Sequence, residues 1–566
     1  MTQTFGTQWL ADKRVLQACK QIVSPKEIFA SCIYGQRVYG FSGRKSDINI
    51  LLIVSLYSPT IRGFSRRLDR ANLSILVVDR QAFETDVARG KLGEMLTEIV
   101  ALPYMPWKNA RYLKKMEVKI KKRFVVELLE DIVRQYPEMA GELLIQPEYF
   151  MYEVFRRQAK LLPPSTFSFS AIFIGRMRER NINSVMDGYV EALKELDSEK
   201  HVVLVNGYLR INENFIEVTK QGSSRLTNIL VSIQKALLPY TQSISKTTTA
   251  LLRNPRLLTN RVFKRAEEET FKEWEETERY LLMPTPLGPV PLSDKITIKD
   301  FVRKAVPGGE ALNIMVERMG GVLNSVFLIS LQRNNETQKI VAKKYEDWLG
   351  FKWFPLALWA LGSQSFAVMG SARLEREYAA NQFLRKNGFP VPRVLYVSLK
   401  ERLIFKEFVE GEKVSEAVKR IISSSPSKVS SNDTKVIRAV GWELAKVHLA
   451  GIALGDCKPE NILAARTGRT CFLDLEQATR SGNQPWDVAE FLYYSGHYIL
   501  PTQSDKAART IASSFIEGYL EAGGRRLNVR KAASAKYTKV FSVFTLPNII
   551  VIMANICKRM GGTSGE

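Results

Sequence analysis

The chain has 566 residues, of which 45% are hydrophobic and 25% are charged. This is the composition of a globular protein of several domains, and it excludes a mainly disordered or collagen-like chain. Lys and Arg number 82 against 58 Asp and Glu, which gives a net charge of +24. This excess favours a polyanionic partner: RNA, DNA, a ribonucleoprotein or an anionic membrane surface. The five cysteines form no C-x-x-C pair and only three histidines occur, so we expect neither a disulfide framework nor a zinc site.

Two segments bear on membrane association. The N-terminal residues lack the basic-then-apolar order of a secretory signal peptide. Residues 540–557 are apolar, but they include Pro547, Asn548 and Asn555 and barely reach the ~18–20 residues of a membrane span. We therefore expect a cytoplasmic protein without stable membrane insertion, in which residues 540–557 form a buried helix.

The first segment, residues 1–145, alternates helix-like and strand-like stretches. Residues 48–55 and 73–78 are continuous apolar runs, which are typical of buried strands. Between residues 107 and 123, eight basic side chains alternate with apolar ones and predict an amphipathic basic helix. Its charged face is either solvated or binds a polyanion, and we favour the solvated face.

The first apolar run lies in a motif that resembles the polymerase-β-like minimal nucleotidyltransferases. Gly40 and Ser42 precede the strand, and Asp47 and Asn49 stand at its start. In that family a glycine-serine turn binds triphosphate, and carboxylates on neighbouring strands hold Mg²⁺. Here Asn49 replaces the second carboxylate and Ser74 the third, so the resemblance implies a degenerate α/β domain without nucleotidyltransferase activity.

Three segments precede the second half of the chain. Residues 146–220 predict helices followed by a hairpin with an Asn206-Gly207 turn, an order that resembles a winged helix-turn-helix module. Residues 221–282 form a basic helical segment, either a solvated spacer or an RNA-binding element, and we favour the spacer. Residues 283–292 contain four prolines and predict an extended linker.

Residues 293–566 carry the motif from which we expect catalysis. Asp456, Lys458 and Asn461 lie in LGDCKPENIL, and Asp474 follows an apolar stretch, an order that matches the protein-kinase active centre. Asp456 would orient the acceptor hydroxyl, and Lys458 would stabilise the γ-phosphoryl group. Asn461 and Asp474 would hold Mg²⁺ or Mn²⁺.

Upstream motifs fit the nucleotide-binding lobe of the same fold. Gly320 and Gly321 form a turn between two strand-like runs and would cover the phosphates of ATP. The strand IVAKKY follows and would supply a lysine to the α- and β-phosphates. Neighbouring residues on a strand point to opposite faces, and of the two candidates we favour Lys343 over Lys344.

Two further elements complete this lobe. The helical stretch 373–384 offers a carboxylate partner for the lysine, and we favour Glu377 over Glu375. Residues 403–411, including Glu407 and Phe408, would form the hinge that receives adenine.

The second half resembles the compact atypical RIO kinases and the kinase subunit of the KEOPS complex, notably in the G-x-P-V-P element at 388–392. It lacks the His-Arg before Asp456 and the D-F-G at Asp474, and only 13 residues separate Asp474 from Asp487, too few for a long activation loop. The resemblance implies a two-lobed, ATP-dependent kinase for serine or threonine hydroxyls of a protein substrate or of the chain itself.

Two alternatives remain open. Gly320-Gly321-x-x-Asn324 and Asp474-x-Glu476 resemble the aminoglycoside and choline phosphotransferases, whereas Lys458 resembles the serine/threonine kinases. The other alternative is a nucleic-acid-binding assembly factor whose kinase domain senses ATP. Taken together, the sequence predicts an α+β multidomain protein that consists of a nucleotidyltransferase-like domain, a helical or winged-helix-like module and a two-lobed kinase-like domain.

Overall fold

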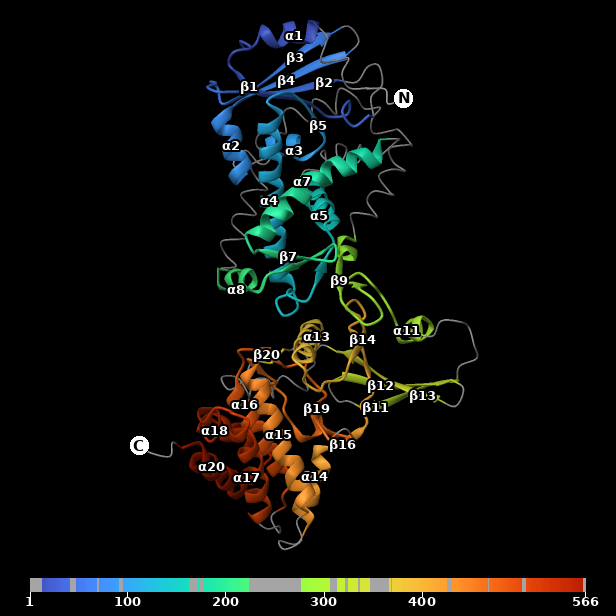
Figure 1. The fold of residues 1–566 in the computed structure, drawn as a ribbon, viewed down its shortest axis with the longest axis vertical. Coiled ribbons are helices and arrows are strands. Elements are labelled where there is room, and N and C mark those ends of the chain that lie inside the picture. The colour runs from blue at the N-terminus through green and yellow to red at the C-terminus, as the bar shows by residue number, and fades with distance from the viewer. Residues whose placement is uncertain are drawn as a thin grey trace. The chain divides into compact units, whose positions relative to one another are not determined.

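The computed structural model describes residues 13–40, 47–68, 71–90, 95–161, 172–173, 177–222, 276–305, 313–320, 324–333, 336–346, 366–367, 369–424, 430–466, 468–500 and 505–562. The chain divides into two compact units, Met1–Leu282 and Met283–Glu566. Figure 1 draws the first unit in blue to green and the second in yellow to red. Ser42, Gly321 and most of the basic segment 221–282 lie outside the described residues.

The first unit begins with a mixed five-stranded sheet of order β3-β4-β2-β1-β5. Strand β2 runs antiparallel to β1 and parallel to β4. Both predicted apolar runs form strands, as β2 and β4, and α1 covers the face of the sheet opposite α2, α3 and α4 (Figure 1). The bounds are α1 Lys13–Lys20, β1 Ile28–Tyr34, β2 Ile48–Val54, β3 Ile61–Leu68, β4 Ala71–Asp79, α2 Arg80–Arg89, α3 Met95–Ala101, β5 Tyr104–Lys108 and α4 Ala110–Gln135.

The predicted basic helix is the N-terminal half of α4, but its charges are not all solvated. Lys121 is buried and its Nζ lies 2.6 Å from Glu117 Oε1 and 2.7 Å from the carbonyl oxygen of Val185. Lys122 Nζ pairs with Glu195 and Glu199 of α7 (Arg178–Ser198) at 3.0 and 2.6 Å. Lys121 is therefore not part of a solvated or polyanion-binding face, because it is buried and paired with Glu117 of α4 itself, and the charge of Lys122 is paired with carboxylates of α7.

The Asn206-Gly207 hairpin belongs to a larger sheet of the first unit. Asn206 and Gly207 have φ of 49° and 83°, the positive values that this turn requires. Strand β8 also pairs with β6, and β6 with β9, so the hairpin is not an isolated wing. The bounds are β6 Leu144–Ile145, α5 Glu148–Leu161, β7 Val202–Val205, β8 Tyr208–Ile211, α8 Glu213–Gly222, η2 Thr277–Tyr280 and β9 Leu281–Met283.

The proline-rich residues 283–292 are folded rather than a free extended linker. Thr285 and Gly288 close a turn in which Gly288 has φ 106°. Val290 and Leu292 are buried, and Val290 packs into the core of the second unit's sheet. The prolines interrupt regular secondary structure, but apolar residues of this segment such as Val290 are still buried in a hydrophobic core.

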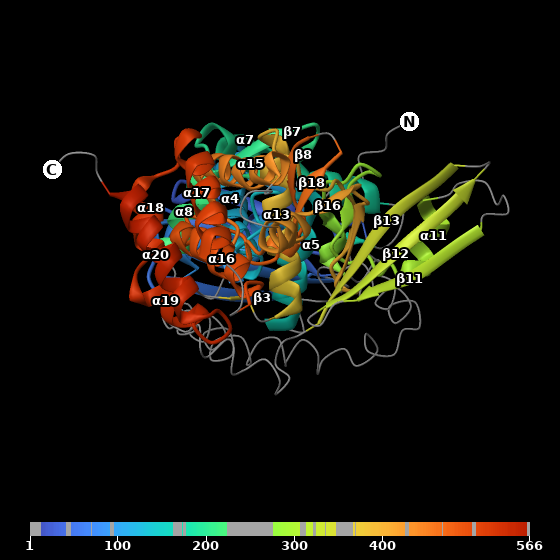
Figure 2. The same ribbon diagram turned by 90° about the horizontal axis from the view of Figure 1, so that it is seen from below.

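The small lobe of the second unit is an antiparallel sheet of order β11-β12-β13-β15-β14. Helix α11 covers one face, where the rings of Phe301 and Phe405 stack with centroids 3.9 Å apart. Figure 2 shows β11, β12 and β13 side by side. The bounds are β10 Val290–Pro291, α11 Ile298–Ala305, β11 Asn313–Gly320, β12 Asn324–Arg333, β13 Glu336–Tyr345, α13 Gly370–Lys386, β14 Val394–Ser398 and β15 Leu403–Glu407.

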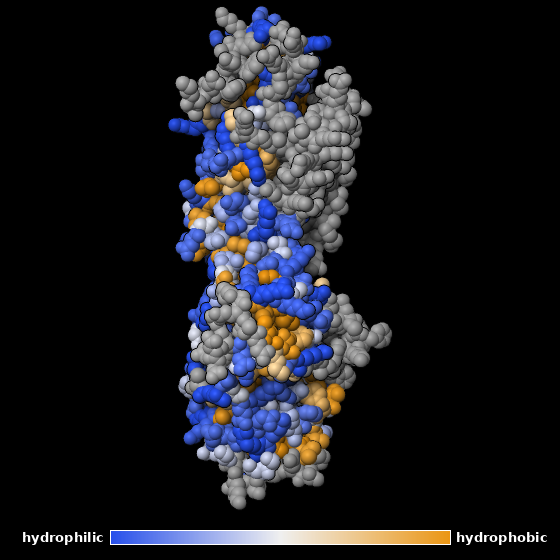
Figure 3. Space-filling view, turned by 90° about the vertical axis from the view of Figure 1, so that its right-hand side faces the viewer, coloured by the Kyte–Doolittle hydropathy of each residue, from blue (hydrophilic) through white to orange (hydrophobic). Residues whose placement is uncertain are grey.

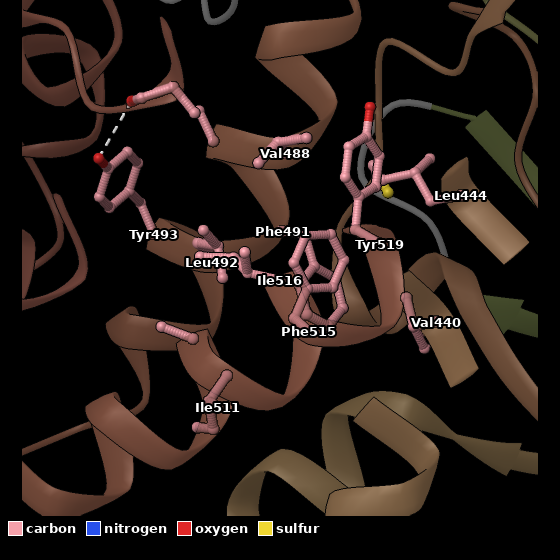
Figure 4. Packing of buried hydrophobic residues seen from close by; sticks show 14 of the residues in the cluster. Val440, Leu444, Val488, Phe491, Leu492, Tyr493, Ile511, Phe515, Ile516 and Tyr519 are labelled. Carbon is pink, nitrogen blue, oxygen red and sulfur yellow. Dashed lines mark hydrogen bonds between the residues drawn. The ribbon is translucent and has the colours of Figure 1, made fainter. Parts of the chain in front are cut away.

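The large lobe is mainly helical. Its core includes Phe491 of α16 and Phe515 of α17, whose rings stack at 4.4 Å (Figure 4). Helices α15 and α17 approach closely because Gly441 and Gly518 carry no side chain. The bounds are β16 Gly411–Lys413, α14 Val414–Ser423, α15 Ser431–Leu449, β17 Ile452–Ala453, η3 Pro459–Asn461, β18 Ile462–Ala465, β19 Thr470–Phe472, β20 Thr479–Arg480, α16 Gln484–His497, α17 Asp505–Glu521, α18 Arg526–Ala532, α19 Ala535–Phe541 and α20 Pro547–Gly561.

The apolar residues 540–557 contribute to this core. They span the end of α19 and most of α20, and Ile549, Met553 and Cys557 are buried. Among the described helices none combines the length and hydropathy of a membrane span. The face drawn in Figure 3 is mostly hydrophilic where it is coloured, with separate apolar patches.

Candidate nucleotide site

Strand register decides which lysine of IVAKKY faces the large lobe. Residue 343 pairs with Ile404 of β15, and its side chain is buried. Lys344 points to the opposite face of the strand and is only partly buried. The structure therefore brings Lys343, and not Lys344, into a cluster of carboxylates.

Lys343 Nζ lies among three carboxylates from two elements. It is 2.9 Å from Glu377 Oε2 of α13, 2.7 Å from Asp474 Oδ1 and 2.9 Å from Glu476 Oε2. Burial alone would lower the pKa of Lys343, but the three carboxylates together raise it well above its usual value. Oxygens of these carboxylates lie within 4.8 Å of one another, as in a metal site, and the lysine ammonium stands in contact with all three.

Asp474 differs from the other two carboxylates in exposure and charge. Its side chain is 25% exposed, against 1% for Glu377 and 3% for Glu476. Burial would raise the pKa of Asp474, but Lys343 and Lys406 lower it below its usual value, whereas burial and the neighbouring Asp474 raise the pKa of Glu476. Asp474 is therefore the most exposed of the three carboxylates, with a pKa that favours its ionised form, and these are properties that suit a carboxylate to bind a divalent cation.

Glu476 joins three elements of the small lobe to this loop. Its Oε2 accepts a hydrogen bond from Asn324 Nδ2 at 2.8 Å, and its Oε1 lies 3.1 Å from Arg373 Nη1. Arg373 also donates to Asn324 Oδ1 at 2.9 Å. Asn324 is the first residue of β12, so the strand after the glycine turn is tied to the loop that carries Asp474.

The predicted catalytic loop is formed around η3. Lys458 Nζ lies 2.7 Å from Asp456 Oδ1, and both side chains are partly exposed. Asn461 Nδ2 donates to the Asp456 carbonyl at 3.2 Å, which leaves the amide oxygen of Asn461 as the atom suited to a cation. The backbone N–H of Leu473 donates to the Asn461 carbonyl at 2.9 Å, so the loop lies beside Asp474.

Two buried carboxylates of α16 hold this loop, and the sequence predictions gave neither a role. Asp487 accepts from the backbone N–H groups of Leu454 and Gly455 at 2.6 and 2.7 Å, and lies 2.9 Å from His448 Nε2. Glu490 Oε2 accepts from the Cys457 N–H at 2.7 Å, and burial raises the pKa of Glu490 well above its usual value. Charged residues inside the otherwise apolar PWDVAEFLYY are the signal that points to them, because buried carboxylates require partners.

The remaining predicted nucleotide residues lie at the edges of this site. Gly320 ends β11. Glu407 ends β15, and its Oε1 accepts from the Arg393 N–H at 2.8 Å. The backbone N–H of Phe408 donates to the Lys339 carbonyl at 3.3 Å, so this end of the hinge continues the sheet pairing.

In the first unit, the predicted degenerate site is described in part. Asn49 of β2 is the register partner of Ser74 on the parallel strand β4. Gly40 has φ 78°, and Asp47 is exposed immediately before β2. Two uncharged side chains therefore lie side by side where the resemblance places a pair of carboxylates.

Comparisons with known proteins match the second unit to kinases. Residues 339–497 match the lipopolysaccharide kinase (Kdo/WaaP) family. The chain is 32% identical over 106 residues to the KEOPS complex subunit Bud32 of Pyrococcus abyssi, which covers 18% of this chain and 44% of that protein. It is 32% identical over 149 residues to a probable serine/threonine-protein kinase BUD32 homolog of Archaeoglobus fulgidus, which covers 26% of this chain and 66% of that protein.

These matches establish kinase homology in the C-terminal half. The predicted similarity to the KEOPS kinase subunit is confirmed there, whereas the Kdo/WaaP family was not predicted from the sequence. The chain spans less than two thirds of the length of either Bud32 relative. The matched segment 339–497 contains Lys343, Glu377, Asp456, Asn461 and Asp474.

Proposed function

We propose that the second unit is an ATP- and Mg²⁺-dependent kinase that phosphorylates serine or threonine hydroxyls of a protein or of the chain itself. The observation that carries the proposal is the meeting of Lys343, Glu377 and Asp474 beside a loop that holds Asp456, Lys458 and Asn461. A kinase needs these groups because phosphoryl transfer is catalysed mainly by positioning and by charge stabilisation.

Each side chain has a part in this reaction. Lys343, oriented by Glu377, binds the α- and β-phosphates, while Asp474 and Asn461 hold the cation that neutralises the phosphate oxygens when it is bound. Asp456 accepts a hydrogen bond from the attacking hydroxyl and orients it. Lys458, 2.7 Å from Asp456 Oδ1, lies where it can stabilise charge on the transferred phosphoryl group.

A small-molecule acceptor is the second candidate. Asn324 and Glu476, the two residues that resemble small-molecule phosphotransferases, are in direct contact at 2.8 Å. The name of the matched family also favours a saccharide hydroxyl as acceptor. Lys458 favours the protein acceptor, because it resembles the lysine of serine/threonine kinases.

The first unit is proposed to be a degenerate nucleotidyltransferase-like domain that acts as a scaffold. The support is the parallel pairing of β2 with β4, which sets Asn49 beside Ser74. We also propose that the protein works in the cytoplasm. A KEOPS-like assembly or a nucleic acid is its proposed partner, the first from the Bud32 relatives and the second from the charge of +24.

Transfer of ³²P from [γ-³²P]ATP by the full chain tests the proposal. Wild type, Asp474→Asn and, as a matched control, the exposed Asp505→Asn are incubated with Mg²⁺ and with protein, saccharide, choline or aminoglycoside acceptors. We expect label on the chain or a protein acceptor, lost in Asp474→Asn and kept in Asp505→Asn. Label on a small molecule alone would support the second candidate, and absence of transfer to every acceptor would contradict both.

A further inference from the structure

Lys406 is a second buried lysine in the candidate nucleotide site. It lies in β15, one residue before Glu407, and is 5% exposed. Its register partner is Val341, two residues before Lys343 on β13. Side chains of paired residues and of residues two apart share one face of a sheet, so Lys406 and Lys343 project from the same face.

Both lysines bind the same glutamate, one at each oxygen. Lys343 Nζ contacts Glu377 Oε2 at 2.9 Å, and the Tyr345 hydroxyl donates to the same oxygen. Lys406 Nζ donates to Glu377 Oε1 and, at 2.9 Å, to the carbonyl oxygen of Leu473. Leu473 directly precedes Asp474, so Lys406 connects α13 to the backbone that presents the metal-binding carboxylate.

The charges around Lys343 and Lys406 indicate what the second lysine contributes to the site. In the structure, Lys343 contacts Glu377, Asp474 and Glu476. A cation bound to Asp474 and phosphates bound to Lys343 would each compete with these ion pairs. Glu377 and the Leu473 carbonyl would still be held by Lys406, because its two hydrogen bonds are made to these groups and not to Asp474 or Glu476.

We propose that Lys406 is a positioning residue for the metal-bound nucleotide: it fixes Glu377 and the Leu473 carbonyl, and thereby aligns Lys343 and Asp474 for Mg-ATP. This inference rests on the proposed kinase function. It assigns a role to Lys406, which lies in the predicted hinge but was given no role there. It places the action of Lys406 on the metal and phosphate end of the nucleotide rather than on adenine.

Equilibrium binding of ATP to the full chain, with and without Mg²⁺, tests this role. The variants are Lys406→Met, Lys406→Arg and, as a control on the opposite face of the sheet, Lys344→Met. We expect Lys406→Met to weaken binding about tenfold with Mg²⁺ and less than threefold without it. Lys406→Arg should restore binding with Mg²⁺ to within threefold of wild type, and Lys344→Met should match wild type.

Three results would overturn the inference. Wild-type affinity of Lys406→Met in Mg²⁺ would show that Lys406 is dispensable, and equal weakening with and without Mg²⁺ would indicate a direct nucleotide contact instead. Failure of Lys406→Arg to restore binding would indicate packing alone. If Lys406→Met does not fold, Lys406→Gln keeps a donor for the Leu473 carbonyl and removes the charge, and the same comparison applies.

The outcome is separable from that of the kinase proposal. A wild-type chain that binds Mg-ATP but transfers no phosphate would contradict the kinase function and leave the Lys406 comparison decisive. A wild-type chain that binds no ATP would overturn both.

Discussion

The two carboxylates of α16 that contact the catalytic loop are predicted to differ in how much stability an amide substitution costs. Asp487 uses both oxygens: Oδ1 accepts from Gly455 N–H, and Oδ2 accepts from Leu454 N–H and contacts His448 Nε2. Glu490 uses Oε2 alone, for the Cys457 N–H and for Trp486 Nε1 at 3.1 Å. Asp487→Asn must therefore turn an NH₂ group toward a backbone donor, whereas Glu490→Gln keeps its accepting oxygen in place.

The expected cost follows from those contacts. Asp487→Asn leaves at least one buried backbone donor without an acceptor, so we expect the free energy of unfolding to fall by about 1–3 kcal/mol for one lost hydrogen bond and by up to about 6 kcal/mol for two. Glu490→Gln should cost less than about 1 kcal/mol, because its accepting oxygen stays in place and burial, which raises the pKa of Glu490, favours the uncharged carboxyl that an amide resembles.

The pH dependence gives an additional test with a defined sign. A carboxyl with a raised folded-state pKa binds more protons folded than unfolded, so wild-type stability falls as the pH rises through the interval between the two pKa values. Glu490→Gln lacks this titration, and its stability relative to wild type should increase with pH. Urea unfolding of the full chain, followed by tryptophan fluorescence between pH 5 and 8, measures both effects.

Equal losses in the two variants would refute this reasoning. So would an Asp487→Asn protein within about 0.5 kcal/mol of wild type, since a buried donor facing an amide NH₂ group cannot be neutral in energy. Transfer activity provides a second comparison, because Leu454 and Gly455 directly precede Asp456. We expect Asp487→Asn to lose activity more strongly than Glu490→Gln.

Three further predictions concern other parts of the chain. Gly441→Ala should lower the unfolding free energy by about 1–3 kcal/mol, because its Cβ would lie 2.0 Å from the Phe515 carbonyl oxygen, whereas exposed Lys435→Ala should change urea unfolding little. Glu98→Gln should gain stability over wild type from about pH 4.5 to 7, by at most about 3 kcal/mol, because burial raises the pKa of Glu98 from 4.5 to about 7. Lys122→Glu should leave salt-dependent RNA retention unchanged.

Each of these three has a contrary outcome. Wild-type stability of Gly441→Ala would mean that α15 and α17 are not in close contact. A pH-independent difference for Glu98→Gln would mean that this carboxyl titrates normally. Loss of RNA retention in Lys122→Glu would indicate that α4 does bind a polyanion. The ion pairs of Lys122 with Glu195 and Glu199 would then have to open when RNA binds.

The sequence predicted the local parts of the kinase site well, because those parts depend on spacing and strand alternation. Asp456, Lys458 and Asn461 lie close together in one loop, and Asp474 follows the strand β19, so their spacing in the sequence is enough to predict their arrangement. Strand alternation offered two lysines, and the structure brings Lys343 to the carboxylates. The Glu377 preference likewise agrees with the observed contact of 2.9 Å.

Contacts between distant segments could not be predicted in the same way. Lys406 lies in residues 403–411, which the sequence indicates as a hinge, and nothing local shows that Glu377, 29 residues away, turns toward it. The burial of Lys121 in the basic helix cannot be predicted from the sequence for the same reason. Lys121 is buried because α7 packs against α4. Gly188 of α7 makes this close packing possible, since a Cβ at this position would lie 2.2 Å from Glu117 Oε1.

The most direct test of the nucleotide site is chemical labelling with an acyl phosphate of ATP, which transfers its acyl group to an amine beside the bound phosphates. The full chain is labelled with and without excess Mg-ATP, and the modified lysines are identified by mass spectrometry. The structure predicts labelling of Lys343 or Lys458, suppressed by Mg-ATP and reduced in Asp474→Asn. Labelling of Lys344 instead, or labelling that Mg-ATP does not suppress, would contradict the nucleotide site described here.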